Sequence, residues 1–345
     1  MNDVLLGVFD GYMPLERDKL TSETKIGGTP TYFPDLCEHD QEKISKWTTC
    51  GVCGRKMYLV VQAFSPLPEA PALHHRMIYI FCCNTDACSY QPSGSWCAFT
   101  LQVDLLDSQA LNDEQEDIAV LADPLPACEL PMYTFPPCYI DIVPQPKKEI
   151  VVPTDLEAEM IRVAEENARN SEMTVEDIQE LEQVVDLKDK PSDYEFDKFR
   201  RKLAMMPSQV IRYYPRCSFE REKKACSSTS TLPLFMRLTK VKDILRIPPC
   251  IRCGAALTHE LQVMPTSAHY LRVCDYVPAN DSEHNEGVDW GTVTLFVCSK
   301  NCSLNHKGVL LSKEFIFVEA PPALQDEVEG SRGRVDLRTF MTQLP

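Results

Sequence analysis

The 345-residue chain lacks any long apolar run. Its uninterrupted apolar stretches are short, about the length of residues 77–83. A membrane-spanning helix needs about 20 consecutive, mainly apolar residues. We therefore expect no segment of the chain to cross a bilayer.

Familiar catalytic motifs are also absent. The chain contains no Gly-x-Ser-x-Gly, no phosphate-binding loop and no His-Glu-x-x-His, the patterns that mark many hydrolases, nucleotide-binding enzymes and zinc proteases. The pair Gly27-Gly28 stands before Pro30 without the longer glycine pattern of a phosphate site, so it predicts a turn. We expect a protein that is not an enzyme.

The N-terminus lacks the pattern of a secretory signal. Met1-Asn2-Asp3-Val4 offers no basic flank ahead of a long apolar core. Disulfides form mainly in oxidising compartments. We therefore expect a cytoplasmic protein whose 16 cysteines are reduced.

Basic residues are scarce in the middle of the chain. Residues 104–197 include 25 acidic and 6 basic residues, a balance of −19 that leaves +3 for the remainder of a chain with net charge −16. A nucleic-acid-binding protein would carry a basic patch, so we expect no direct contact with nucleic acid. The acidic segment is typical of a solvated spacer or of a surface that meets a basic partner.

One cysteine pattern occurs twice. Residues 50–54 (Cys-Gly-Val-Cys-Gly) lead into a β-like run that reaches Gln62, and residues 250–254 (Cys-Ile-Arg-Cys-Gly) lead to Gln262. In both copies a strand rich in β-branched and aromatic residues then delivers a second cysteine pair. Both cysteines of the first pair, the glycine and the glutamine recur 200 positions later, which indicates a divergent internal duplication.

Each copy supplies four thiols to one predicted metal site. A Cys-x-x-Cys turn directs two thiolates at one ion, and the distant pair completes a tetrahedral set with no open position for water. Such a site is structural, and zinc binding contributes roughly 10–16 kcal/mol of apparent free energy to folding. We predict two structural zinc ions, with the ligands Cys50, Cys53, Cys83 and Cys88 in the first site and Cys250, Cys253, Cys298 and Cys302 in the second.

Other uses of these residues remain open at this point. A redox Cys-x-x-Cys would stand where a strand meets a helix, whereas residues 57–61 after the first pair predict a strand. His74 and His75 are alternative ligands, although four cysteines already fill a tetrahedron. Cys82 adjoins Cys83 and could replace it. We expect most cysteines outside the two sets to be buried small hydrophobes.

The predicted fold class is α+β and β-rich, with two duplicated zinc-stapled β modules that pack together and an acidic helical insertion between them. The predicted domains are an N-terminal module (1–103), an acidic, partly disordered and helical insertion (104–192), a C-terminal module (193–320) and a polar tail (321–345). Alternating and β-branched patterns predict further strands at 4–10, 77–81, 96–103, 139–143, 209–214, 292–297 and 315–318. Amphipathic spacing predicts helices at 154–164, 174–185 and 194–205.

The second of these helices leaves nuclear transport open. Ile178, Leu181, Val185 and Leu187 match the loose spacing of a leucine-rich nuclear-export signal. Any amphipathic helix shows this spacing. Shuttling to the nucleus therefore stands as an alternative to a purely cytoplasmic location.

Several of these segments resemble a known family. They are 25–30 (Lys-Ile-Gly-Gly-Thr-Pro), 50–68, 76–88, 198–213, 247–265 and 289–302, and together they resemble the programmed cell death protein 2 family, which includes the yeast 20S rRNA accumulation protein 4 and the programmed cell death protein 2-like branch. The resemblance fails between about 104 and 190. The founding member carries an additional MYND finger there, whereas this chain has only Cys128 and Cys138, so it is similar to the finger-less branch.

The resemblance implies a dedicated chaperone. Family members bind the nascent small-subunit ribosomal protein of the universal S5 family (eukaryotic S2), which would link this chain to 40S assembly and 20S pre-rRNA maturation. The acidic middle would mask the charge of a basic client, and we expect a monomer apart from that client. A nuclear zinc adaptor in transcription, proliferation or apoptosis is the alternative, and a zinc hydrolase is a more distant third.

Overall fold

The computed structural model describes residues 4–33, 36–67, 74–89, 91–104, 122–126, 129–146, 194–216, 233–236, 247–278 and 285–321. The strands are β1 (Leu5–Tyr12), β2 (Lys25–Ile26), β3 (Tyr58–Phe64), β4 (His74–Cys82), β5 (Trp96–Asp104), β6 (Cys138–Pro144), β7 (Gln209–Tyr213), β8 (Leu257–Val263), β9 (Thr292–Cys298), β10 (Val309–Lys313) and β11 (Phe315–Glu319). The helices are α1 (Leu15–Asp18), α2 (Glu38–Trp47), α3 (Pro92–Ser95), α6 (Tyr194–Ala204) and α9 (Thr266–Tyr270), with short 3-10 turns η1 (Asp86–Cys88) and η5 (Cys302–Asn305).

The described strands form a single antiparallel sheet, which confirms the predicted β-rich character. Its order is β10-β5-β4-β3-β2-β6-β1-β7-β8-β9-β11. From β6 and β1 at the centre, β2, β3, β4 and β5 run outward on one side, and β7, β8, β9 and β11 run outward on the other. Strands of the N-terminal half therefore lie on one side of the centre, and strands of the C-terminal half follow in the same outward sequence on the other side, so the order is close to a palindrome.

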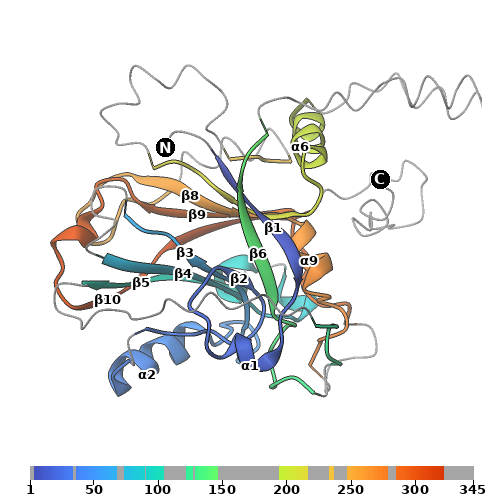
Figure 1. The fold of residues 1–345 in the computed structure, drawn as a ribbon. Helices are drawn as coiled ribbons and strands as arrows, with labels where there is room; N and C mark the ends of the chain where they lie inside the picture. The colour runs from blue at the N-terminus through green and yellow to red at the C-terminus, as the bar shows by residue number, and fades with distance from the viewer. Residues whose placement is uncertain are drawn as a thin grey trace, which may run out of the picture.

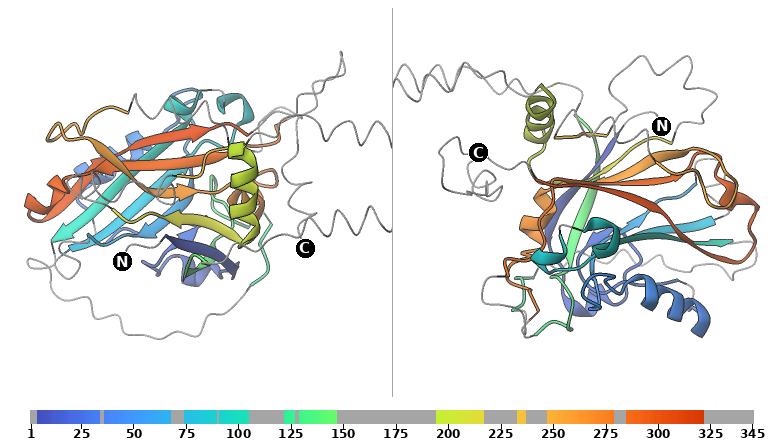
Figure 2. Two further views of the ribbon diagram at one scale, coloured as in Figure 1. Left: turned by 90° about the horizontal axis from the view of Figure 1, so that it is seen from above. Right: turned by 180° about the vertical axis from the view of Figure 1, so that it is seen from behind.

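The sheet is bent until its two ends nearly meet. Strands β8 and β9 form one layer and β3, β4, β5 and β10 form the facing layer, with β1 and β6 crossing in front of both (Figure 1). The end strands β10 and β11 are consecutive in the chain and are joined by Glu314 alone. Views from above and from behind show the same two layers (Figure 2).

One core fills the space between the layers. Buried side chains from both halves meet there, including Ile78 and Ile80 of β4 and Leu295 and Val297 of β9. Trp96 and Trp290, one from each half, touch edge to face with ring centroids 5.3 Å apart. The halves share one sheet and one core, and the domain boundaries predicted from the sequence remain a prediction.

The two halves repeat one another in register. The ladder between β3 and β4 shifts between Leu59 and Val61, and the ladder between β8 and β9 shifts between His259 and Leu261. A bulge thus falls on Val60 in one half and on Glu260 in the other, again 200 positions apart. This agreement supports the predicted duplication.

The repeated glutamines also play the same part in each half. The side chains of Gln62 and Gln262 are fully buried. Gln62 Oε1 accepts from the Thr31 backbone N–H at 2.8 Å, and Gln262 Oε1 accepts from the Leu234 backbone N–H at 3.1 Å. Each amide therefore fixes a neighbouring loop against the sheet, because a buried amide group needs hydrogen-bond partners.

The glycine pair forms a structural turn, as its sequence predicts. Gly27 and Gly28 have φ of +68° and +70°, and a Cβ at Gly28 would lie 2.0 Å from Asp18 Oδ1. That carboxylate oxygen is 2.7 Å from Lys25 Nζ, with both side chains fully buried. Burial lowers the pKa of Lys25 and the neighbouring Asp18 opposes the shift. The turn thus makes room for a buried ion pair.

The structure agrees with one further predicted helix and contains elements that the sequence did not predict. The helix predicted at 194–205 is α6, whereas α2 and β10 were not predicted. The helices predicted at 154–164 and 174–185, the export-like spacing and the polar tail beyond residue 321 lie outside the described residues. Among the helices that the structure describes, none is long and apolar enough to span a bilayer.

Candidate metal centres

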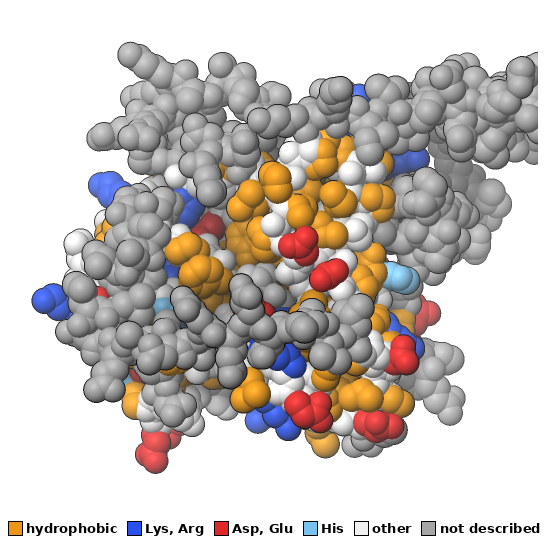
Figure 3. Space-filling model, in the orientation of Figure 1, with side chains coloured by type: hydrophobic (Ala, Val, Ile, Leu, Met, Phe, Trp, Pro, Cys, Tyr) orange, Lys and Arg blue, Asp and Glu red, His pale blue; other side chains and the backbone are white. Residues whose placement is uncertain are grey.

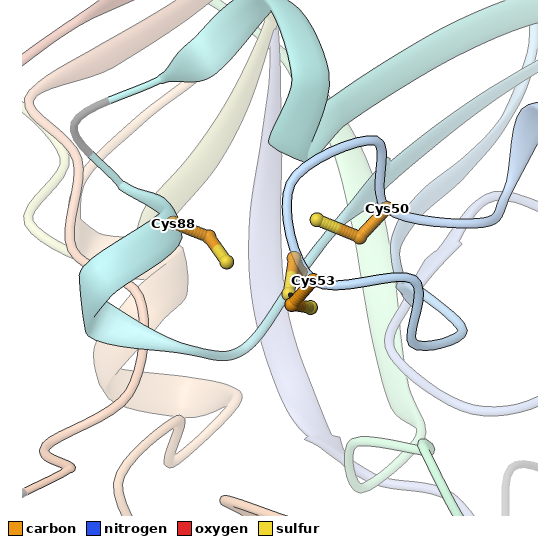
Figure 4. A group of neighbouring side chains, drawn as sticks. Cys50, Cys53 and Cys88 are labelled. Atoms are coloured by element: carbon orange, nitrogen blue, oxygen red, sulfur yellow. Dashed lines mark hydrogen bonds between the residues drawn. The ribbon is translucent and has the colours of Figure 1, made fainter.

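The first cysteine cluster joins a loop to the end of a strand. Cys50 and Cys53 lie in the loop between α2 and β3, Cys83 directly follows β4, and Cys88 ends η1. The four Sγ atoms lie within 4.8 Å of one another. In Figure 4 the sulfur atoms of Cys50, Cys53 and Cys88 point toward a common centre.

The second cluster repeats this arrangement in the C-terminal half. Cys250 and Cys253 lie in the loop before β8, Cys298 is the last residue of β9, and Cys302 begins η5. Its four Sγ atoms also lie within 4.8 Å of one another. The structure therefore brings together all eight cysteines predicted from the sequence, in the predicted two sets of four.

The two Cys-x-x-Cys turns share one backbone geometry. The N–H of Gly54 donates to the Cys50 carbonyl at 2.9 Å, and that of Gly254 donates to the Cys250 carbonyl at 2.8 Å. Both glycines have positive φ, +73° and +68°, although no atom lies within 4 Å of a Cβ built on either one. Glycine is favoured here by the backbone conformation rather than by lack of space.

The sulfur positions fit a tetrahedral zinc ion. With Zn–S bonds of about 2.3 Å, neighbouring sulfur atoms of a tetrahedron lie about 3.8 Å apart. The distance from Cys53 Sγ to Cys83 Sγ is 3.6 Å. In the second cluster the Sγ atoms of Cys253 and Cys298 are 3.5 Å apart, and those of Cys250 and Cys302 are 3.8 Å apart. A disulfide would bring two sulfurs to about 2.0 Å. Both clusters are thus spaced for a metal.

The electrostatics of the clusters also favour a cation. Burial raises the pKa of Cys83 to about 12 and raises that of Cys88, with the neighbouring thiols adding to both shifts. In the second cluster the Ala255 backbone N–H, followed by the Cys298 thiol, lowers the pKa of Cys253 to about 7. Four thiolates would repel one another, and a divalent cation removes that repulsion by displacing the remaining protons.

The alternative ligands Cys82 and His75 lie elsewhere, and the side chain of His74 is outside what the structure describes. Cys82 is fully buried in the core between the layers, on the opposite face of the strand from Cys83, since successive side chains of a strand alternate. His75 packs against the rings of Phe33 and Phe64. Eight residues of extended chain, about 26 Å, separate it from Cys83. None of these side chains joins the first cluster.

Neighbouring cysteines 82 and 83 allow a matched test of metal content. We expect Cys83→Ala to lower the bound metal from two ions per chain to one, because three thiolates would remain in the first cluster. Cys82→Ala should retain both ions and lose only core packing. Inductively coupled plasma mass spectrometry of both purified variants measures this. Two ions retained in Cys83→Ala would contradict the proposed ligand set.

Fold and clusters together define the class of protein: a β-rich chain with a near-closed antiparallel sheet, built from two related halves that each carry a closed four-cysteine group. Two family models match it. The model of the programmed cell death protein 2 N-terminal domain matches residues 3–115, and that of the programmed cell death protein 2 C-terminal putative domain matches residues 193–320. The chain belongs to the programmed cell death protein 2 family.

Curated relatives cover most of the chain at low identity. Programmed cell death protein 2 of Bos taurus is 23% identical over 85% of this chain and 90% of its own length. Programmed cell death protein 2-like of Mus musculus is 23% identical over 87% of this chain and 91% of its own length. Programmed cell death protein 2-like of Homo sapiens is 22% identical over 87% of this chain and 90% of its own length. No solved structure matches the chain.

Proposed function

We propose that this protein is a non-enzymatic, zinc-stabilised escort of a basic small-subunit ribosomal protein of the universal S5 family, acting in 40S assembly and 20S pre-rRNA maturation. It would act as a monomer in the cytoplasm, shuttle to the nucleus, and bind its client stoichiometrically.

The observation that carries this proposal is the closed chemistry of both clusters. Each has four cysteines at tetrahedral spacing, so a zinc ion bound there would have no open position for water or substrate. Such ions stabilise a fold rather than activate a reactant. The proposed activity of the protein is therefore binding through its surface.

The charge of the chain supports a basic client. A net charge of −16, concentrated in residues 104–197, opposes contact with nucleic acid and favours a positively charged partner. A ribosomal protein without its RNA is such a partner, since its basic surface is then uncompensated. The resemblance to the programmed cell death protein 2 family points to the same class of client.

A second candidate function follows from the names of the relatives. The curated relatives are named for programmed cell death, which favours a zinc-dependent adaptor that regulates transcription or apoptosis through protein contacts. It would use the same closed clusters, so the identity of the partner separates the two candidates.

Native mass spectrometry tests the proposed function. The protein is purified without chelator from cells that are actively making ribosomes. We expect two zinc ions per chain and one bound basic polypeptide of ribosomal size, identified by peptide sequencing as an S5-family protein. Untagged cells processed in parallel are the control. Enrichment of chromatin factors with no ribosomal protein would favour the adaptor and contradict the escort.

A further inference from the structure

The palindromic sheet places two cations at equivalent positions. Lys25 of β2 lies opposite Gln62 of β3, and Arg212 of β7 lies opposite Gln262 of β8. Both cations are buried, with 0% and 2% of their surface exposed. The two halves therefore each contain a buried positive charge beside the repeated glutamine.

The two cations differ in what neutralises them. Lys25 Nζ is 2.7 Å from the equally buried Asp18 carboxylate. Arg212 donates to neutral groups: Gln209 Oε1 at 2.6 Å, Gln145 Oε1 and the Tyr214 hydroxyl. Its Nε has no hydrogen-bond partner, and no ion pair joins it to a carboxylate of the described residues. Among the residues that the structure describes, no carboxylate takes the place beside Arg212 that Asp18 takes beside Lys25.

A buried Arg212 without a negatively charged partner is unfavourable for folding. A buried cation without a counter-charge costs folding free energy, which is why buried charges are normally paired. The same protein follows that rule at another buried arginine: Arg76 donates to both oxygens of Glu260, at 2.6 Å and 2.9 Å. The unpaired charge at Arg212 thus calls for an anion.

The surroundings of Arg212 indicate how that anion is presented. Its neighbour Ile211 belongs to the main core, so Arg212 points to the opposite face of the sheet. There it lies beside Leu6, which is in turn opposite Val143. Leu6 and Val143 cluster with Val4, Val8, Met206 and Tyr214. Hydrophobic side chains gather over β1 and β6 in the space-filling view (Figure 3).

We propose that Arg212 anchors a site for the carboxylate side chain of a polypeptide partner that packs on the half-buried side chains of this face, Val8 and Val143. Leu6 and Tyr214 beside them are already buried within the protein. Gln145 is only partly buried, and by moving away it would free Nη2 beside the unpaired Nε. Those two groups are spaced to bind both oxygens of one carboxylate. Asp18 beside Lys25 shows that the equivalent position in the other half takes a carboxylate.

The same face limits the charge of the partner. Asp10 and Asp141 are exposed on β1 and β6, and Asp141 lies opposite Val8. A wholly acidic segment would be repelled by these carboxylates. The segment that fits carries its acidic residue among apolar or basic residues. The inference does not depend on the identity of the client proposed above and can fail or succeed separately from it.

Stability measurements on matched variants test whether Arg212 lacks a counter-charge. Arg212→Met and Lys25→Met are compared with the full-length zinc-loaded protein in low-salt buffer. We expect Lys25→Met to lower the melting temperature by about 4 °C or more, since it leaves Asp18 unpaired. Arg212→Met should leave the melting temperature unchanged or raise it. A decrease for Arg212→Met of at least half that of Lys25→Met would overturn the proposal.

An anion titration of the wild-type protein gives a second test that needs no variant to fold. Sodium acetate is the probe for a carboxylate, and sodium chloride at matched ionic strength is the control. We expect acetate to raise the melting temperature of the wild type above the chloride curve, and Arg212→Met to abolish that difference. Identical curves for wild type would overturn the proposal, as would stabilisation by inorganic phosphate that exceeds that by acetate.

Discussion

Replacing Cys250 with serine is expected to unfold the C-terminal half of the protein. The substitution removes one of four ligands from the second cluster, and a structural zinc ion contributes about 10–16 kcal/mol of apparent free energy. Whole domains are stable by only about 5–15 kcal/mol. Because β8 and β9 belong to the sheet and core that also include the first half, we expect the loss to spread beyond the loop.

Circular dichroism during thermal unfolding, together with metal analysis, measures this effect. We expect Cys250→Ser to bind at most one zinc ion and to lose its cooperative transition or shift it far to lower temperature. Cys37→Ser is the matched control, since Cys37 is exposed and outside both clusters. Unchanged thermal stability of Cys250→Ser would refute a structural metal at the second cluster.

Replacing Glu260 with glutamine is the second substitution expected to have a large effect. Glu260 and Arg76 are almost fully buried and join the two halves of the sheet through two hydrogen bonds. Ser65 donates to the same carboxylate, and Arg216 Nε lies 3.6 Å from it. Breaking such a pair leaves a buried charge uncompensated, so we expect Glu260→Gln to lower the free energy of unfolding by about 3–5 kcal/mol at pH 7.

The pH dependence of this pair has a defined sign. Burial would raise the pKa of Glu260, but Arg76 and then Arg216 outweigh it and lower that pKa from 4.5 to about 2. A depressed pKa means that the stabilisation is fully present above pH 4.5 and is lost as the pH falls toward 2. Acid also protonates cysteine ligands, so the informative quantity is the difference in free energy of unfolding between wild type and Glu260→Gln.

Urea unfolding at several pH values measures that difference. We expect it to be constant from pH 7 to about 5 and to shrink at lower pH. The double variant Arg76→Met/Glu260→Met is the control. It loses the Glu260 carboxylate beside Arg216, as Glu260→Gln does, but it leaves no Arg76 charge uncompensated, so it should be more stable than Glu260→Gln. A Glu260→Gln protein as stable as wild type at pH 7 would show that the pair does not hold the halves together.

Local sequence patterns predicted much of this molecule. The short spacing within each cysteine pair was enough to predict the metal ligands. The glycine after each Cys-x-x-Cys marks a backbone conformation that other residues adopt rarely. Runs of β-branched, aromatic and alternating residues predicted most strands. The geometry of a strand also separates Cys82 from Cys83, because adjacent residues of a strand face opposite sides. The offset of 200 paired Gln62 with Gln262, and the two residues lie at equivalent positions in the sheet.

Features that depend on distant pairing could not be predicted in this way. Nothing near Arg76 in the chain indicates that its counter-charge is Glu260, 184 residues away. The central place of β1, between β6 and β7, also arises from pairing between distant segments. The helix α2 is short, with Ile44 as its buried residue, and so offers little of the apolar periodicity by which a helix is recognised.

The pairing of β10 with β5 has a consequence for the synthesis of the protein. Strand β5 ends at Asp104, but its outer neighbour β10 begins at Val309. At a translation rate of about 5–20 residues per second, roughly 10–40 s pass between the synthesis of these two strands. Throughout that interval β5 is an open edge that can pair with other chains. A protein proposed to guard a nascent client therefore passes through a vulnerable stage of its own on the ribosome.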